Sequence, residues 1–208
     1  DGGAPLIHFD LLDQALDTLL KNGGRPFFEL MGSPSGFFSD FNDLGQLTLW
    51  KDMIAALARH LIERYGLEEV LNWAFETWNE PDANGWSKQW PADEKAFCNY
   101  FDACCAGLWS VEPRLRMGGP GTCRHLSSLL KTFLAHVDSG RSCLSGADEL
   151  RIDFISFHEK GARSHAEELT PNSQGISDRE AAIITYIRTH HPRLAGLPVM
   201  NNECDPQV

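Results

Sequence analysis

The chain has 208 residues, of which 42 % are hydrophobic and 23 % are charged, so it can bury a core and is not disordered by composition. Eighteen Lys and Arg against 29 Asp and Glu give a formal charge of −11, which excludes the basic footprint of a nucleic-acid-binding surface. Because no run of about 18 apolar residues occurs, we expect no membrane-spanning segment.

Alternating patterns along the chain predict strands and helices in turn. Short apolar runs that end in Gly, Asn or Pro predict strands at 26–30, 73–78, 115–118, 152–158 and 198–202. Amphipathic stretches predict helices at 10–22, at 47–65, after Pro91, at 126–137 and after a Ser177/Glu180 cap. Asp43 and Gln46 form a capping box for the second helix, and Gly66 is expected to end it.

The predicted strands recur at intervals of roughly 43 residues, which leaves room for a strand, a helix and a loop in each unit. This rhythm favours an α/β fold in which helices connect parallel strands. A doubly wound sheet and a (β/α)₈ barrel both fit the pattern, and a barrel built of such units needs roughly 340 residues. We therefore expect residues 1–208 to form one incomplete domain.

Two acidic motifs follow predicted strands, at 76–82 and at 201–206. Active sites on parallel α/β scaffolds lie at the carboxyl ends of strands, where Glu80 and Glu203 stand, although position alone also fits an exposed loop carboxylate. Strand alternation places Glu76 deeper on the same face as Glu80, which predicts a paired structural residue. Glycoside hydrolysis requires two carboxylates that flank the glycosidic bond to be broken. A closed barrel would bring the second and fifth predicted strands to face each other, whereas an open sheet would not.

Five segments, in order along the chain, resemble glycoside hydrolase family 39: FELMGS at 28–33, FETWNEPD at 75–82, GGPG at 118–121, HEKGARS at 158–164 and NECDP at 202–206. The WNEPD and KGARS blocks are the most specific. The resemblance implies a partial (β/α)₈ TIM barrel that holds strands three to seven and the helices between them, with the first two strands and the eighth absent. On either side of Glu203, Asn202 and Cys204 replace an acidic and a small residue of the family pattern.

The resemblance also implies roles for individual residues. Glu80 matches the general acid/base and Glu203 the nucleophile, while Asn79 matches a residue that binds the sugar beside the reacting bond. Lys160 matches a lysine that binds a substrate carboxylate; without the resemblance it would be a solvated surface charge. His158 ends the same predicted strand, where either sugar binding or packing of the imidazole fits.

By the same resemblance we expect a retaining exo-glycosidase that hydrolyses terminal α-L-iduronosidic bonds in dermatan sulfate and heparan sulfate in the lysosome, without a cofactor. A β-xylosidase of the family is one alternative, which Lys160 disfavours because xylose has no carboxylate. A carbohydrate-binding pseudoenzyme or an inert fragment is another, and we expect these 208 residues alone to be inactive. A metal site built from His158, Glu80, Glu203 and Asp205 is disfavoured because no ligand pair shares one strand or helix.

Overall fold

The structure is a computed structural model that describes residues 6–31, 36–83, 93–148, 150–161 and 172–206. Helices and strands alternate in the order α1 (Asp10–Lys21), β1 (Phe27–Glu29), α2 (Leu44–Tyr65), α3 (Leu67–Val70), β2 (Ala74–Glu76), α5 (Glu94–Val111), β3 (Arg116–Thr122), α6 (Ser128–Ser139), β4 (Phe154–Phe157), α7 (Ser173–His190), the 3₁₀ helix η1 (Pro192–Leu194) and β5 (Val199–Asn201). The five strands and the five long helices predicted from the sequence are confirmed.

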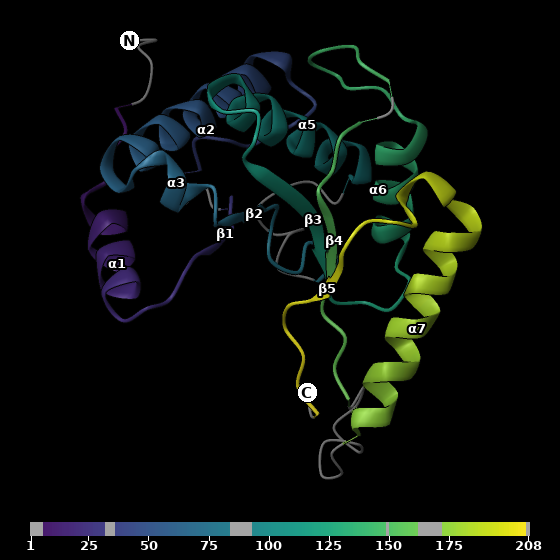
Figure 1. Ribbon diagram of the computed structural model, residues 1–208. Helices are drawn as coiled ribbons and strands as arrows, with labels where there is room; N and C mark the ends of the chain where they lie inside the picture. Colours follow the sequence, from purple (N-terminus) through teal and green to yellow (C-terminus); the bar gives the residue numbers. More distant parts are fainter. Residues whose placement is uncertain (1–5, 32–35, 84–92, 149, 162–171, 207–208) are drawn as a thin grey trace.

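The five strands form one parallel sheet in the sequential order β1-β2-β3-β4-β5. A doubly wound sheet reverses its strand order at a switch point, whereas a barrel adds each strand beside the preceding one. The sheet is therefore an arc of a (β/α)₈ barrel, as expected. Figure 1 shows α2, α5, α6 and α7 curving around one side of this arc.

The outer face of the sheet is apolar and packs against the helices. Phe28, Phe75 and Met117 lie in register on β1, β2 and β3, and the last two are fully buried. They belong to one hydrophobic core to which α2 contributes Trp50 and α5 contributes Phe97. Successive residues of each strand thus point in turn to the face that packs against the helices and to the face that lines the inside of the barrel.

The inner face carries a different set of residues. Glu29, Glu76, Gly118 and Phe154 form one row across β1 to β4, because each is in register with the next. A Cβ atom on Gly118 would lie 2.4 Å from the Phe154 ring, so only glycine fits at that position. Two carboxylates therefore lie side by side within the barrel, near its carboxyl-terminal rim.

The predicted boundaries of α2 are correct in their main features. The Asp43 carboxylate accepts a hydrogen bond from the Gln46 N–H at 2.8 Å, and Gly66 follows the helix with a φ of 84°. The reciprocal half of the capping box differs, because Gln46 Oε1 accepts from the N–H groups of Ser39 and Asp40. The glutamine thus stabilises the approach to the helix.

The predicted N-cap of the last helix, Ser177, is wrong by five residues, because the observed N-cap is Asn172. The α7 helix begins at Ser173, where the Asn172 side chain accepts from the Gly175 N–H, and Ser177 lies inside the helix. Asn and Ser are about equally effective as N-caps, and the helix begins after Asn172, which comes first along the chain. The α5 helix begins at Glu94 after an Asp93 cap, while the predicted start at Pro91 lies outside the described residues. No helix among the residues described has the length and apolar character needed to cross a membrane.

The close crossing of α2 and α5 yields a stability prediction. A Cβ atom at Gly107 would lie 2.6 Å from the Lys51 carbonyl oxygen and 2.7 Å from the Ile54 Cβ. We expect Gly107→Ala to lower the free energy of unfolding by about 1–3 kcal/mol through overpacking, measured by denaturant titration of the full-length protein. The control is Gly196→Ala, where the added methyl meets nothing within 4 Å. Equal stability of the two variants would contradict this packing.

Candidate active site

Four charged or titratable side chains meet beyond the carboxyl ends of β2, β4 and β5. His158 Nδ1 lies 3.1 Å from Glu80 Oε1 and 3.5 Å from Glu203 Oε2. Lys160 Nζ donates to Glu203 Oε1 at 2.6 Å. One oxygen of Glu80, one oxygen of Glu203 and a ring nitrogen of His158 all lie within 4.8 Å of one another. The structure thus brings together two carboxylates that are remote in the sequence.

The position of Glu80 is set by an unusual backbone conformation. Its φ is +46°, a region that non-glycine residues seldom adopt and that is often found at functional sites. The Glu80 N–H donates to the Gly121 carbonyl oxygen at 2.9 Å. Gly121 itself has a φ of +63°, and a Cβ there would lie 2.9 Å from the Trp78 carbonyl oxygen. The glycine therefore allows the segment that carries Glu80 to approach β3 closely.

Asp82, the last residue of the WNEPD block, anchors the same segment. Its carboxylate accepts from the N–H groups of Cys123 at 2.8 Å and Arg124 at 3.0 Å. Asn79 is half-buried immediately before Glu80. Trp78 is only 4 % exposed and packs edge-on near Tyr100, which makes it a core residue. The block therefore combines anchoring residues with one carboxylate that faces the site.

The two carboxylates have different electrostatic environments. The hydrogen bond from Lys160 lowers the pKa of Glu203 below its usual range, against a smaller opposing effect of burial, and the charges of His158 and Lys160 lower it further. The same hydrogen bond raises the pKa of Lys160. Asp205 Oδ2 lies 3.7 Å from the ammonium group and adds negative charge on that side. Glu203 is therefore held in its ionised form.

Two further carboxylates lie on the inner face of the sheet. Glu76 is fully buried, and its Oε2 accepts from Asn202 Nδ2 at 2.9 Å, so the prediction of a paired, buried residue is confirmed. Burial raises the pKa of Glu76. Burial also raises the pKa of Glu29, and repulsion from Glu76 raises it further. Glu29 was not predicted as a site residue, although it lies near the carboxyl end of the strand predicted at 26–30 and is the last residue of β1.

The cluster of Glu80, His158 and Glu203 also has the geometry of a cation site. The Lys160 ammonium, however, already lies 2.6 Å from Glu203, where it neutralises the carboxylate and repels a metal ion. Asp205, the fourth residue of the disfavoured metal-site alternative, contacts Lys160. The arrangement is therefore better suited to proton transfer and nucleophilic attack than to metal binding.

Residues 1–208 match the glycosyl hydrolases family 39 over their whole length. The chain therefore belongs to this family, as the five resembling segments predicted.

Three relatives illustrate the similarity. The chain is 43 % identical over 204 residues to the α-L-iduronidase of Homo sapiens. This alignment covers 97 % of this chain and 30 % of the human protein. It is 32 % identical over 165 residues to a β-xylosidase of Geobacillus stearothermophilus, and this alignment covers 74 % of this chain and 31 % of the β-xylosidase. A solved structure of a bacterial orthologue of human α-L-iduronidase superimposes with a TM-score of 0.93 at 47 % identity, covering 100 % of this chain and 34 % of that one. The chain spans about a third of the length of these relatives.

Proposed function

We propose that the protein containing this chain is a retaining glycoside hydrolase in which Glu203 is the nucleophile and Glu80 the general acid/base. The observation that carries the proposal is the approach of the two carboxylates, with an oxygen of each within 4.8 Å of the other. In retaining enzymes the carboxyl groups are about 5–5.5 Å apart, whereas inverting enzymes leave about 6.5–9.5 Å for a water molecule. The short separation supports retention.

The proposed reaction uses the two carboxylates in turn. Glu203 attacks the anomeric carbon while Glu80 protonates the leaving oxygen, which gives a covalent glycosyl–enzyme intermediate. Glu80, now ionised, then removes a proton from the water that releases the sugar and regenerates Glu203. The Lys160 hydrogen bond supports this division of roles because it keeps Glu203 ionised. Asn79, adjacent to Glu80, is proposed to bind the sugar, and His158 to contact both carboxylates during the reaction.

We propose terminal α-L-iduronosyl residues of dermatan sulfate and heparan sulfate as the substrate and the lysosome as the location. The α-L-iduronidases among the relatives support the sugar, and an ammonium group beside the nucleophile provides a partner for the carboxylate of iduronic acid. A β-xylosidase is the second candidate, which the Geobacillus stearothermophilus relative supports.

The barrel is proposed to be completed by parts of the protein outside this sequence. The five strands would be strands three to seven. Strand two would pair with the free side of β1, strand eight would pair with the free side of β5, and strand one would lie between strands two and eight. An open arc exposes both strand edges and part of the inner face, so we expect activity only from the longer protein.

The nucleophile assignment is tested with Glu203→Ala in the full-length protein. We expect turnover of an aryl α-L-iduronide to fall by about a thousandfold or more, because the covalent intermediate cannot form, while substrate still binds. Steady-state kinetics measure the first effect and calorimetric titration the second. Glu63→Ala, which removes an exposed carboxylate of α2, is the matched control and should retain full turnover. Retained turnover in the Glu203 variant would refute the assignment.

Lys160→Met tests both the electrostatics and the substrate. Since Lys160 lowers the pKa of Glu203, its removal raises that pKa, and the acidic limb of the kcat/KM profile should move to higher pH. KM should rise for an aryl α-L-iduronide but not for an aryl β-xyloside, which has no carboxylate. The control Lys95→Met removes an exposed lysine of α5 and should change neither quantity. Better hydrolysis of the xyloside by the unmodified protein would favour the second candidate.

A further inference from the structure

We propose that Glu159 is a positioning residue, which is buried next to the candidate active site and does not itself react. This proposal rests on the proposed glycosidase function. It holds the segment 158–160 against the rest of the fold, so that the side chains on either side of it, His158 and Lys160, reach the two carboxylates. Glu159 touches neither carboxylate in the contacts described, so its influence passes through its neighbours.

The three consecutive side chains point in alternate directions. His158 and Lys160 contact Glu80 and Glu203 at the rim of the barrel. Glu159 lies between them and is only 1 % exposed. Its Oε1 is 2.6 Å from His125 Nδ1, and its Oε2 accepts from Arg179 Nε at 2.9 Å. These partners come from the connection between β3 and α6 and from α7, so the carboxylate joins three segments.

The backbone around Glu159 is fixed by a second set of contacts. The Glu159 N–H donates to Asn201 Oδ1 at 3.0 Å, and Asn201 Nδ2 donates to the Glu159 carbonyl oxygen at 2.9 Å. The same amide donates to Glu180 Oε1 on α7 at 2.8 Å. Arg179, besides binding Glu159, donates to the Gly161 carbonyl oxygen at 3.2 Å. Strand β5, helix α7 and the segment after β4 therefore form one connected network.

This network explains how the carboxylate of Glu159, which takes no part in the reaction, can be buried. A carboxylate removed from water is costly unless it is paired and hydrogen-bonded, and Glu159 has both a guanidinium and an imidazole partner. The geometry that the pairing imposes extends to Lys160, whose ammonium must stay at 2.6 Å from Glu203. Displacements of about 1 Å in such groups can reduce turnover a hundredfold.

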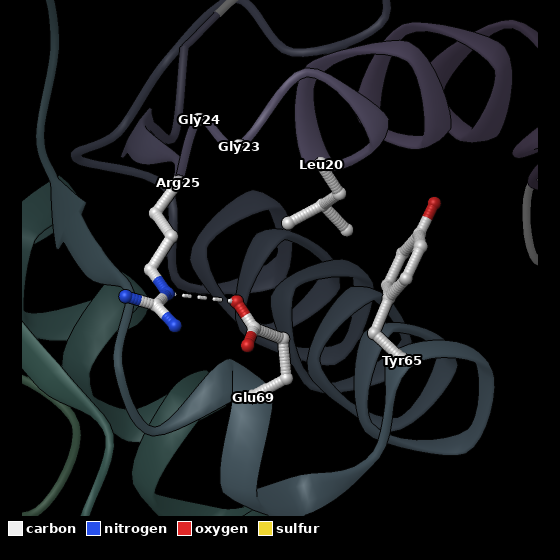
Figure 2. A pocket seen from close by; sticks show the side chains of 6 residues that line it. All are labelled: Leu20, Gly23, Gly24, Arg25, Tyr65 and Glu69. Atoms are coloured by element: carbon white, nitrogen blue, oxygen red, sulfur yellow. Dashed lines mark hydrogen bonds and ion pairs between the residues drawn. The ribbon is translucent and has the colours of Figure 1, made fainter.

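A glutamate at the opposite end of the sheet provides a matched control. Glu69, in the short helix α3, accepts from Arg25 Nε at 3.1 Å and from the Trp73 ring N–H at 3.0 Å. It thus has the same pair of partner types, an arginine Nε and a ring nitrogen. Figure 2 shows the Arg25–Glu69 pair in a cavity beside Leu20 and Tyr65, and Arg25 precedes β1, at the amino ends of the strands.

The experiment compares Glu159→Gln with Glu69→Gln in the full-length protein, using an aryl glycoside that the unmodified protein hydrolyses. We expect Glu159→Gln to lower kcat/KM by about tenfold to a hundredfold and to move the acidic limb of the profile to higher pH, as Lys160→Met does. The direction is informative. Loss of the negative charge of Glu159 by itself would lower the pKa of Glu203, so an upward shift of the limb requires that Lys160 or His158 has moved away from Glu203. Glu69→Gln should leave both quantities unchanged.

A double-variant cycle provides the second readout. Because Glu159 acts in part through Lys160, the factor lost on Glu159→Gln should be at least threefold smaller in the Lys160→Met background. If Glu159→Gln does not fold, as a thermal melt would show, the same cycle is measured with Arg179→Gln. Equal factors in the two backgrounds, or an acidic limb that stays in place or moves to lower pH, would overturn the proposal. Failure of the unmodified protein to hydrolyse any aryl glycoside would instead refute the proposed function.

Discussion

Two carboxylates that approach within 4.8 Å of each other repel, and one of them retains its proton unless positive charge lies close by. Here His158 and Lys160 supply the compensating partners, but they do so unequally. Lys160 binds Glu203 directly, whereas Glu80 contacts the imidazole of His158. This asymmetry is what two-step glycoside hydrolysis requires, since one carboxylate must attack while the other donates a proton.

The asymmetric cluster depends on features of the fold some distance from it. The sequential parallel sheet places the ends of β2, β4 and β5 at one rim, and the small volume of Gly121 lets the Glu80 segment approach β3. Beneath the rim, the Glu76–Asn202 hydrogen bond connects the two segments that carry the carboxylates across the inside of the barrel. The spacing of Glu80 and Glu203 is thus braced by a second, buried contact between the same segments.

Much of the fold could be predicted because it depends on local periodicity. The apolar stripes of α1 and α2, the Asp43 cap and the Gly66 stop depend on residues within a few positions of one another, and these predictions agree with the structure. The α7 boundary failed because two polar residues competed for the cap, and sequence alone does not rank Asn172 above Ser177.

The site was predictable in part, and for different reasons. Glu80, His158, Lys160 and Glu203 follow strands and match a family pattern, and the structure brings all four together. The Glu76–Asn202 contact joins positions 126 residues apart, and no local signal announces it. Glu29 was missed for the same reason, because its nearness to Glu76 follows from strand register.

The most direct test of the central claim is the anomeric configuration of the first sugar released by the full-length protein, followed by proton NMR before mutarotation. The two carboxyl groups of retaining enzymes lie closer together than those of inverting enzymes, and an oxygen of Glu80 lies within 4.8 Å of an oxygen of Glu203, so the account predicts that the first product retains the configuration of the substrate. A first product of inverted configuration would contradict it, because the two carboxylates would then have to separate during the reaction.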